Sequence, residues 1–169
     1  MMLRPSKNDD YILKESAEKL AILLLNWEQP DIKVKIIDPS EHQEYINDMY
    51  KALNRTKSQG FDSYKICAVL ESLGYDSDEN LVEEMTKVWG EVNRLVSKTE
   101  KDWVILYDLK PIYKVGDIID VEGNKGEIVS VDESLAKYTI FIEALGHVKS
   151  KGILGVVRNF EDVQEFKTE

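Results

Sequence analysis

Residues 117–131, with the sequence DIIDVEGNKGEIVSV, mark the point where the hydrophobic pattern of the chain changes. Two short runs rich in Ile and Val, 117–121 and 127–131, have the composition of β-strands. The residues between them, 122–126, form a turn bracketed by glycines. Upstream of this stretch, apolar residues recur every three or four positions, as on amphipathic helices. The sequence therefore predicts an α+β fold, in which an α-helical domain over 1–107 precedes a β domain over 108–169.

The β domain continues beyond this stretch in short runs separated by turn residues. We predict further strands over 137–142, at Val148 and over 153–157, with turns at 132–134 and at Gly146. Several short strands with frequent turns are typical of a small antiparallel barrel.

Two segments of the β domain resemble SH3-like barrels, including KOW-type modules and related phage and bacterial modules. They are YKVGDIIDV at 113–121, with a hydrophobic-x-Val-Gly-Asp entry turn, and GEIVSVD at 126–132, with a glycine that begins the second strand. The resemblance covers about residues 112–158 and implies an SH3-like antiparallel β-barrel. The loops differ from those of nucleic-acid-binding KOW modules, because they carry Glu122, Glu127, Asp132 and Glu133 instead of a basic face. This difference argues against a role on RNA or the ribosome.

Four apolar stripes predict a four-helix N-terminal domain. The first helix is expected to begin at Asp9 or Asp10 and to end before Pro30, and the second runs from Ser40 to about Lys57. The third begins after Asp62 and stops at Gly74, and the fourth runs from Ser77 or Asp78 to Lys98. The expected inner face of the fourth helix includes Trp89. The remaining apolar runs, 32–37 and 103–107, are each interpreted as a short strand or a connector.

Composition limits the classes of function. The 169 residues carry a formal charge of −10 and a pI near 4.8, so extensive neutralisation of phosphates, and with it direct nucleic-acid binding, is not expected.

The lone Cys67 cannot form an internal disulfide, the longest apolar run (21–25) is too short for a membrane span, and the N-terminus has no signal-peptide core. A cytoplasmic location is expected. Arg occurs at only four positions, a Lys bias typical of low-GC bacteria and their phages.

None of the candidate chemical motifs meets its requirements. His42 and His147 lie far apart in the sequence, and Cys67 lies on an apolar stripe without a neighbouring base. The acidic run 76–80 is similar to the start of a calcium loop, but Leu81 replaces the required Gly and Lys87 the required Glu. The glycines of 123–126 precede no helix, so they do not form a phosphate loop. We therefore expect no enzymatic activity, metal or cofactor.

Charged and aromatic residues provide the remaining candidates for a functional surface. The acidic group before and on the fourth helix could contact a basic partner or imitate nucleic-acid phosphates, and tyrosines are common at interfaces. The candidate interaction residues are Asp76, Asp78, Glu79, Glu83, Glu84, Tyr64, Tyr75 and Tyr113. The leading hypothesis is a non-enzymatic protein–protein interaction component of a bacterium, phage or mobile element. The alternatives are a nucleic-acid-linked protein, acting through the barrel or as an acidic mimic, and a structural phage connector.

Overall fold

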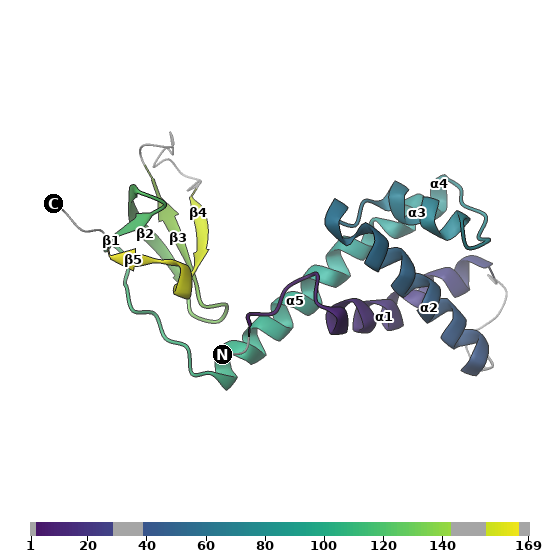
Figure 1. Ribbon diagram of the computed structural model, residues 1–169, viewed down its shortest axis with the longest axis horizontal. Coiled ribbons are helices and arrows are strands. Elements are labelled where there is room, and N and C mark those ends of the chain that lie inside the picture. Colours follow the sequence, from purple (N-terminus) through teal and green to yellow (C-terminus); the bar gives the residue numbers. More distant parts are fainter. Residues whose placement is uncertain (1–2, 29–38, 143–154, 166–169) are drawn as a thin grey trace. The chain divides into compact units, whose positions relative to one another are not determined.

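A computed structural model of the protein describes residues 3–28, 39–142 and 155–165. The chain divides into two compact units, Met1–Thr99 and Glu100–Glu169, which we call the helical unit and the sheet unit (Figure 1). The boundary between the units lies inside helix α5. The α+β class is confirmed. The predicted strands at 32–37 and Val148, and the His147 position, lie outside the described residues.

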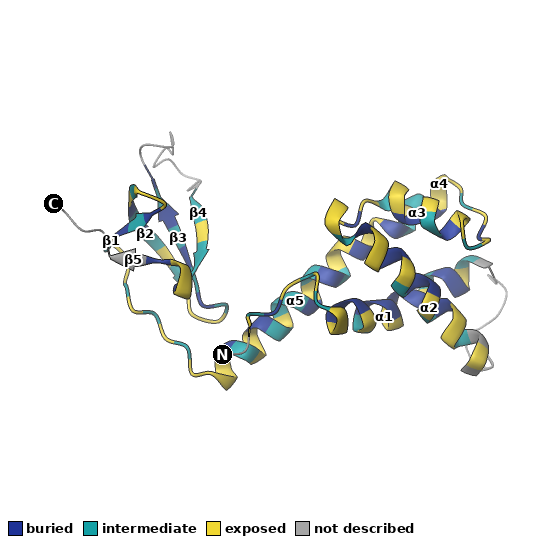
Figure 2. Cartoon of the chain, in the orientation of Figure 1, coloured by how far each residue is buried: buried dark blue, intermediate teal, exposed yellow. Residues whose placement is uncertain are grey.

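The helical unit is built from helices that share one apolar core. They are α1 (Asp10–Glu28), α2 (Pro39–Thr56) with the 3-10 turn η1 (Lys57–Gln59), α3 (Ser63–Glu71), α4 (Glu79–Met85) and the part of α5 (Lys87–Leu106) up to Thr99. In each helix, buried positions alternate with exposed ones, as the colouring in Figure 2 shows, and buried residues from all of these helices belong to one apolar core. The largest fully buried side chains include Leu13, Leu24, Met49, Leu70 and Met85.

The single helix predicted over 77–98 is divided into α4 and α5 at Thr86. The backbone N–H of Thr86 donates to the carbonyl of Glu83 at 3.1 Å, and its hydroxyl donates to the same oxygen at 2.6 Å. A threonine that bonds back to its own helix in this way competes with the regular ladder and interrupts it. Trp89 also differs from expectation, because its side chain is 46% exposed and Lys7 Nζ lies 5.1 Å from the centre of its ring.

Local sequence signals fix several helix ends. Asp62 Oδ1 accepts a hydrogen bond from the backbone N–H of Lys65 at 3.0 Å, which confirms this residue as the cap of α3. At the other end, Gly74 has φ +103, a left-handed conformation that favours glycine. Its N–H donates to the Glu71 carbonyl at 3.0 Å, and the Tyr75 N–H donates to the Leu70 carbonyl at 3.2 Å. This Schellman pattern turns Tyr75 back into the core.

Residues 103–106 belong to α5, so the predicted strand or connector there is wrong. Val104 is buried while Ile105 and Leu106 are exposed, which is a helical periodicity at the end of an amphipathic helix. The helix ends in a second Schellman pattern, in which Asp108 has φ +47 and the Leu109 N–H donates to the Val104 carbonyl at 3.1 Å. The left-handed position is occupied by an Asp instead of a Gly, so the usual stop signal is missing from the sequence.

The sheet unit contains five strands in the order β4-β3-β2-β1-β5, with every neighbouring pair antiparallel. The strands are β1 (Ile118–Val121), β2 (Asn124–Asp132), β3 (Lys137–Phe141), β4 (Val156–Asn159) and β5 (Gln164–Glu165). The first hairpin has a two-residue turn in which Glu122 (φ +55) and Gly123 (φ +82) are both left-handed, as a type I′ turn requires. The turn is thus shorter than the predicted 122–126, and β5 was not predicted.

Closure of the sheet into a barrel is not confirmed. Among the described residues, β4 and β5 are the two edges of the sheet and no pairing joins them. The core of the unit lies on one face, where Tyr138 is fully buried beside Phe160 with a ring-centre distance of 4.4 Å. The Tyr138 hydroxyl accepts hydrogen bonds from the backbone N–H groups of Ile112 and Tyr113 at 3.0 and 3.1 Å, which fixes the chain that enters β1.

Candidate functional site

The predicted acidic residues lie together in the turn before α4 and on α4 itself. Asp76, Asp78, Glu79 and Glu83 are exposed, whereas Glu84 is half-buried and forms an ion pair with Lys87. The carboxylate of Asp78 accepts hydrogen bonds from the N–H groups of Asn80 and Leu81, at 2.8 and 3.0 Å, so it serves as the helix cap. The structure therefore brings the acidic residues together and gives two of them local structural partners.

A groove separates the C-terminal part of α1 from α4, and we call it the α1–α4 groove. It has a volume of about 490 Å³ and is lined by Leu23, Asn26, Trp27, Asn80, Glu83 and Glu84. The indole N–H of Trp27 donates to the carbonyl of Asp76 at 3.1 Å, which ties the ring to the turn that carries the acidic residues. Leu23 and Trp27 also pack against the helical core, so the groove combines an apolar floor with carboxylates on one wall.

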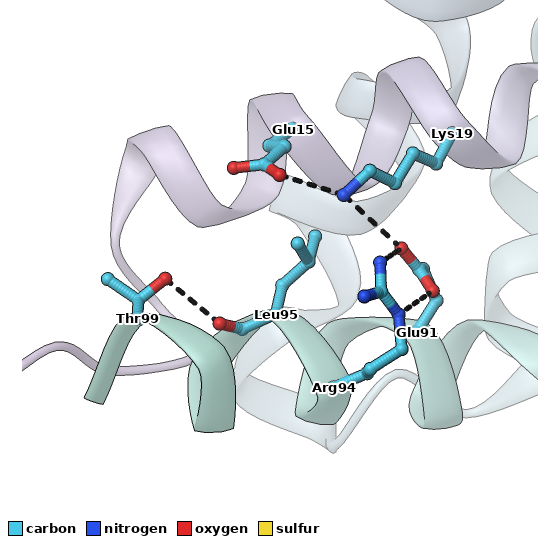
Figure 3. A network of polar contacts seen from close by, with 6 residues as sticks. All are labelled: Glu15, Lys19, Glu91, Arg94, Leu95 and Thr99. Carbon is cyan, nitrogen blue, oxygen red and sulfur yellow. Dashed lines mark hydrogen bonds and ion pairs between the residues drawn. The ribbon is translucent and has the colours of Figure 1, made fainter. Parts of the chain in front are cut away.

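A neighbouring groove between α1 and α5 is lined by basic side chains, each of which is already paired with a carboxylate. It has a volume of about 360 Å³ and is lined by Lys19, Leu20, Leu23, Lys87, Glu91 and Arg94. Figure 3 shows its network: Arg94 donates two hydrogen bonds to Glu91, and Lys19 Nζ lies 2.7 Å from a Glu15 oxygen and 3.7 Å from a Glu91 oxygen. The hydrogen bonds from Arg94 lower the pKa of Glu91 below its usual value. This network joins α1 to α5.

The three candidate tyrosines differ in burial, and they are divided between the two units. Tyr64 is 73% exposed in the first turn of α3. Tyr75 is buried, its hydroxyl donates to Asp48 Oδ2 at 3.1 Å, and it is therefore a core residue and not part of a surface. Tyr113 is half-buried and belongs to the sheet unit, where its ring centre lies 6.2 Å from that of Tyr138.

Sequence reasoning missed a second feature, a run of exposed apolar side chains in the sheet unit. These are Ile105 (77% exposed), Leu106 (73%), Tyr107 (41%), Ile112 (80%) and Val115 (59%), and we call them the 105–115 apolar segment. The Tyr107 ring lies against Trp103 with a centre distance of 5.5 Å. The available signal was the helical period: if Val104 faces inward on a continued α5, its neighbours Ile105 and Leu106 must face outward.

The described part of the chain offers little for covalent or metal chemistry. Burial raises the pKa of the Cys67 thiol to about 11, so the nucleophilic thiolate is disfavoured. Among the described residues, no group of three or more His, Cys, Asp or Glu side chains is arranged to hold a metal ion. None of the helices in the described ranges combines the length and apolar character of a membrane span.

Comparison of the chain with protein-family models, with curated proteins and with solved structures finds no match. The functional assignment therefore depends on the two surfaces above, the α1–α4 groove of the helical unit and the 105–115 apolar segment of the sheet unit.

Proposed function

We propose that the protein is a non-enzymatic protein–protein interaction component that acts as an adaptor, an assembly piece or an inhibitor of a larger machine. The 105–115 apolar segment carries this proposal. Ile105, Leu106 and Ile112 each expose more than 70% of their area to water within eight residues of sequence. Exposed apolar surface of this kind is typical of interaction sites, because each Å² that a partner covers contributes roughly 25 cal/mol.

We also propose that the sheet unit is an SH3-like barrel module. Its entry turn supports this interpretation: Gly116 has φ +93, and Asp117 Oδ2 accepts a hydrogen bond from the Lys114 N–H at 2.9 Å. The Gly116 N–H donates to the Ile128 carbonyl at 2.8 Å, which aligns the turn with β2 before β1 begins. The turn thus has a structural role in the segment that carries the resemblance.

The test is a pull-down from cells of the source organism with the full chain as bait, and identification of the captured protein by mass spectrometry. We expect the triple variant Ile105→Ser, Leu106→Ser, Ile112→Ser to lose the partner. Val157→Ser is the matched control, because Val157 is 55% exposed on β4, outside the segment. A partner retained equally by the triple variant and the wild type would contradict the proposal. Circular dichroism of both variants, compared with the wild type, tests that each is folded.

The exposed carboxylates of Asp76, Glu79 and Glu83 favour a second candidate function, imitation of nucleic-acid phosphates. A mimic displaces DNA from a DNA-binding protein without binding DNA itself. A gel-shift series at low salt, with and without the captured partner, distinguishes this function from direct binding through the barrel. If Glu79→Gln and Glu83→Gln displace DNA from the partner as well as the wild type does, mimicry is contradicted.

A further inference from the structure

We propose that the α1–α4 groove is a second docking site, specific for a basic segment of a partner protein that combines Lys or Arg with an apolar side chain. The site lies in the helical unit and does not depend on the 105–115 apolar segment. The assignment is based on the floor of the groove, its wall and the charge balance around it.

The floor of the groove is a fixed aromatic and aliphatic surface. Trp27 is held by its indole hydrogen bond to the Asp76 carbonyl and by packing against the helical core, so its ring position is set before any ligand arrives. Leu23 extends the apolar floor along α1. A ring of this kind binds the methylene chain and the cationic end of a Lys or Arg side chain, with a gain of about 0.5–2 kcal/mol for a cation over the ring.

The wall of the groove supplies negative charge. Glu83 lines the groove with an exposed carboxylate that makes no hydrogen bond or ion pair to another described residue. Glu84, beside it, is already paired with Lys87. An incoming ammonium or guanidinium can therefore pair with Glu83 without breaking an existing contact, and such charge-assisted hydrogen bonds are stronger than neutral ones.

The charges around the groove disfavour negatively charged ligands. Lys19 and Arg94 in the neighbouring groove are neutralised by Glu15 and Glu91, and the exposed Asp76 and Glu79 lie on the turn and helix that carry Glu83. The local field is thus negative, in keeping with the charge of −10 for the whole chain. A phosphate or an acidic peptide is repelled, whereas a basic segment is attracted and its association is accelerated.

The volume is appropriate for one or two side chains of a docked segment. The groove measures about 490 Å³, within the range of roughly 300–1,000 Å³ for sites that bind small ligands. We therefore expect one cationic side chain over Trp27 and Glu83 and one apolar side chain over Leu23, with the backbone of the segment outside the groove.

The test is an NMR titration of the full-length, ¹⁵N-labelled protein with three probes: a short helical peptide of Leu, Ala and Lys, its counterpart with Glu for Lys, and a DNA duplex. The Trp27 indole N–H and the side-chain amides of Asn26 and Asn80 line the groove and report binding there directly. We expect the basic peptide alone to shift these three signals. Equal shifts with the acidic peptide or the duplex would overturn the proposal, as would shifts confined to other residues.

A pair of charge-reversal variants completes the test. Glu83→Lys is expected to weaken the basic peptide about tenfold, which corresponds to about 1.4 kcal/mol. The control Glu133→Lys makes the same change in net charge in the exposed turn between β2 and β3, and its Kd is expected to stay within about twofold of the wild type. Equal weakening by both variants would overturn the proposal in favour of non-specific charge attraction. The proposal would also be overturned if the wild type self-associates and Glu83→Lys does not, because the groove would then bind a second copy of the chain.

Discussion

Gly126 illustrates how one residue without a side chain allows the sheet to pack. It lies buried on β2 opposite Ile119, and a Cβ at this position would lie 2.5 Å from Cγ2 of Ile140. Ile140 is fully buried and β-branched, so it has little freedom to move away. The glycine is required by packing and not by backbone conformation, because the side chains of the neighbouring strands leave no room for a Cβ at this position.

Gly126→Ala is therefore expected to lower the free energy of unfolding of the sheet unit by about 1–3 kcal/mol through overpacking. The matched control is Gly90→Ala in α5, where an added Cβ meets no atom within 4 Å. This second change is expected to stabilise the protein by about 0.5–1 kcal/mol, because alanine has a higher helix propensity than glycine. Urea unfolding measures both variants, and the same sign of change in both would contradict this explanation.

The pKa of Glu91 predicts a dependence of stability on pH. Hydrogen bonds from Arg94 lower this pKa in the folded state, so the carboxylate stabilises the fold above the pKa of the unfolded chain. The contribution is present above about pH 5 and is lost as the pH falls through the lowered value, at a cost of about 0.5–1 kcal/mol. Glu91→Gln is expected to reduce this acid-dependent loss, measured as unfolding free energy between about pH 5 and pH 3. Glu133→Gln is the control variant. If the unfolding free energy of Glu91→Gln falls with pH as steeply as that of the wild type and the control, the assignment is contradicted.

The boundary between the two units lies inside helix α5, and the part of the helix that belongs to the sheet unit, residues 100–106, begins with an ion pair to the sheet. Lys137 Nζ at the start of β3 lies 2.7 Å from Glu100 Oε2, and the Glu100 side chain is only 7% exposed. Val104, one turn further along the helix, packs into the core of the sheet unit. The ion pair to β3 and the burial of Val104 therefore hold residues 100–106 of α5 to the sheet unit.

Replacement of one residue of the Lys137–Glu100 ion pair should lower the free energy of unfolding, because the other residue keeps its charge in a buried position. Lys137→Met removes the ammonium and leaves the Glu100 carboxylate buried, so we expect a loss of about 2–4 kcal/mol in the unfolding free energy of the sheet unit. The double variant Glu100→Gln, Lys137→Met removes both charges and is expected to recover part of the loss. Thermal unfolding monitored by circular dichroism measures the series. A double variant less stable than Lys137→Met would contradict this interpretation.

Elements set by local signals could be predicted from the sequence, and elements set by packing could not. Asp62 caps α3 and Gly74 ends it through contacts within a few residues. By contrast, residues 103–106 have β-branched and aromatic side chains, yet they are helical because Val104 is buried against the sheet. The sequence indicates the acidic residues of the groove, but it does not indicate Trp27, which reaches the turn before α4 through a hydrogen bond to the Asp76 carbonyl, 49 residues away.

At the scale of the whole molecule, the charge of −10 predicts how the protein behaves toward nucleic acids. Acidic residues are shared between both units, and the exposed carboxylates Asp76, Glu79 and Glu83 add to the field of the helical unit. We expect no complex with duplex DNA in a gel shift even at about 50 mM salt, where phosphate contacts are strongest. A shifted band that weakens with added salt would contradict this expectation.

The central claim is that the 105–115 apolar segment contacts a protein partner, and the most direct test is calorimetric titration of the purified chain with the purified captured protein. We expect Ile105→Ser, Leu106→Ser, Ile112→Ser to weaken the Kd by about a hundredfold or more, since the variant removes three apolar side chains and each Å² that a partner covers contributes roughly 25 cal/mol. Val157→Ser should leave the Kd within about twofold. A triple variant that is folded and binds as tightly as the wild type would contradict the claim.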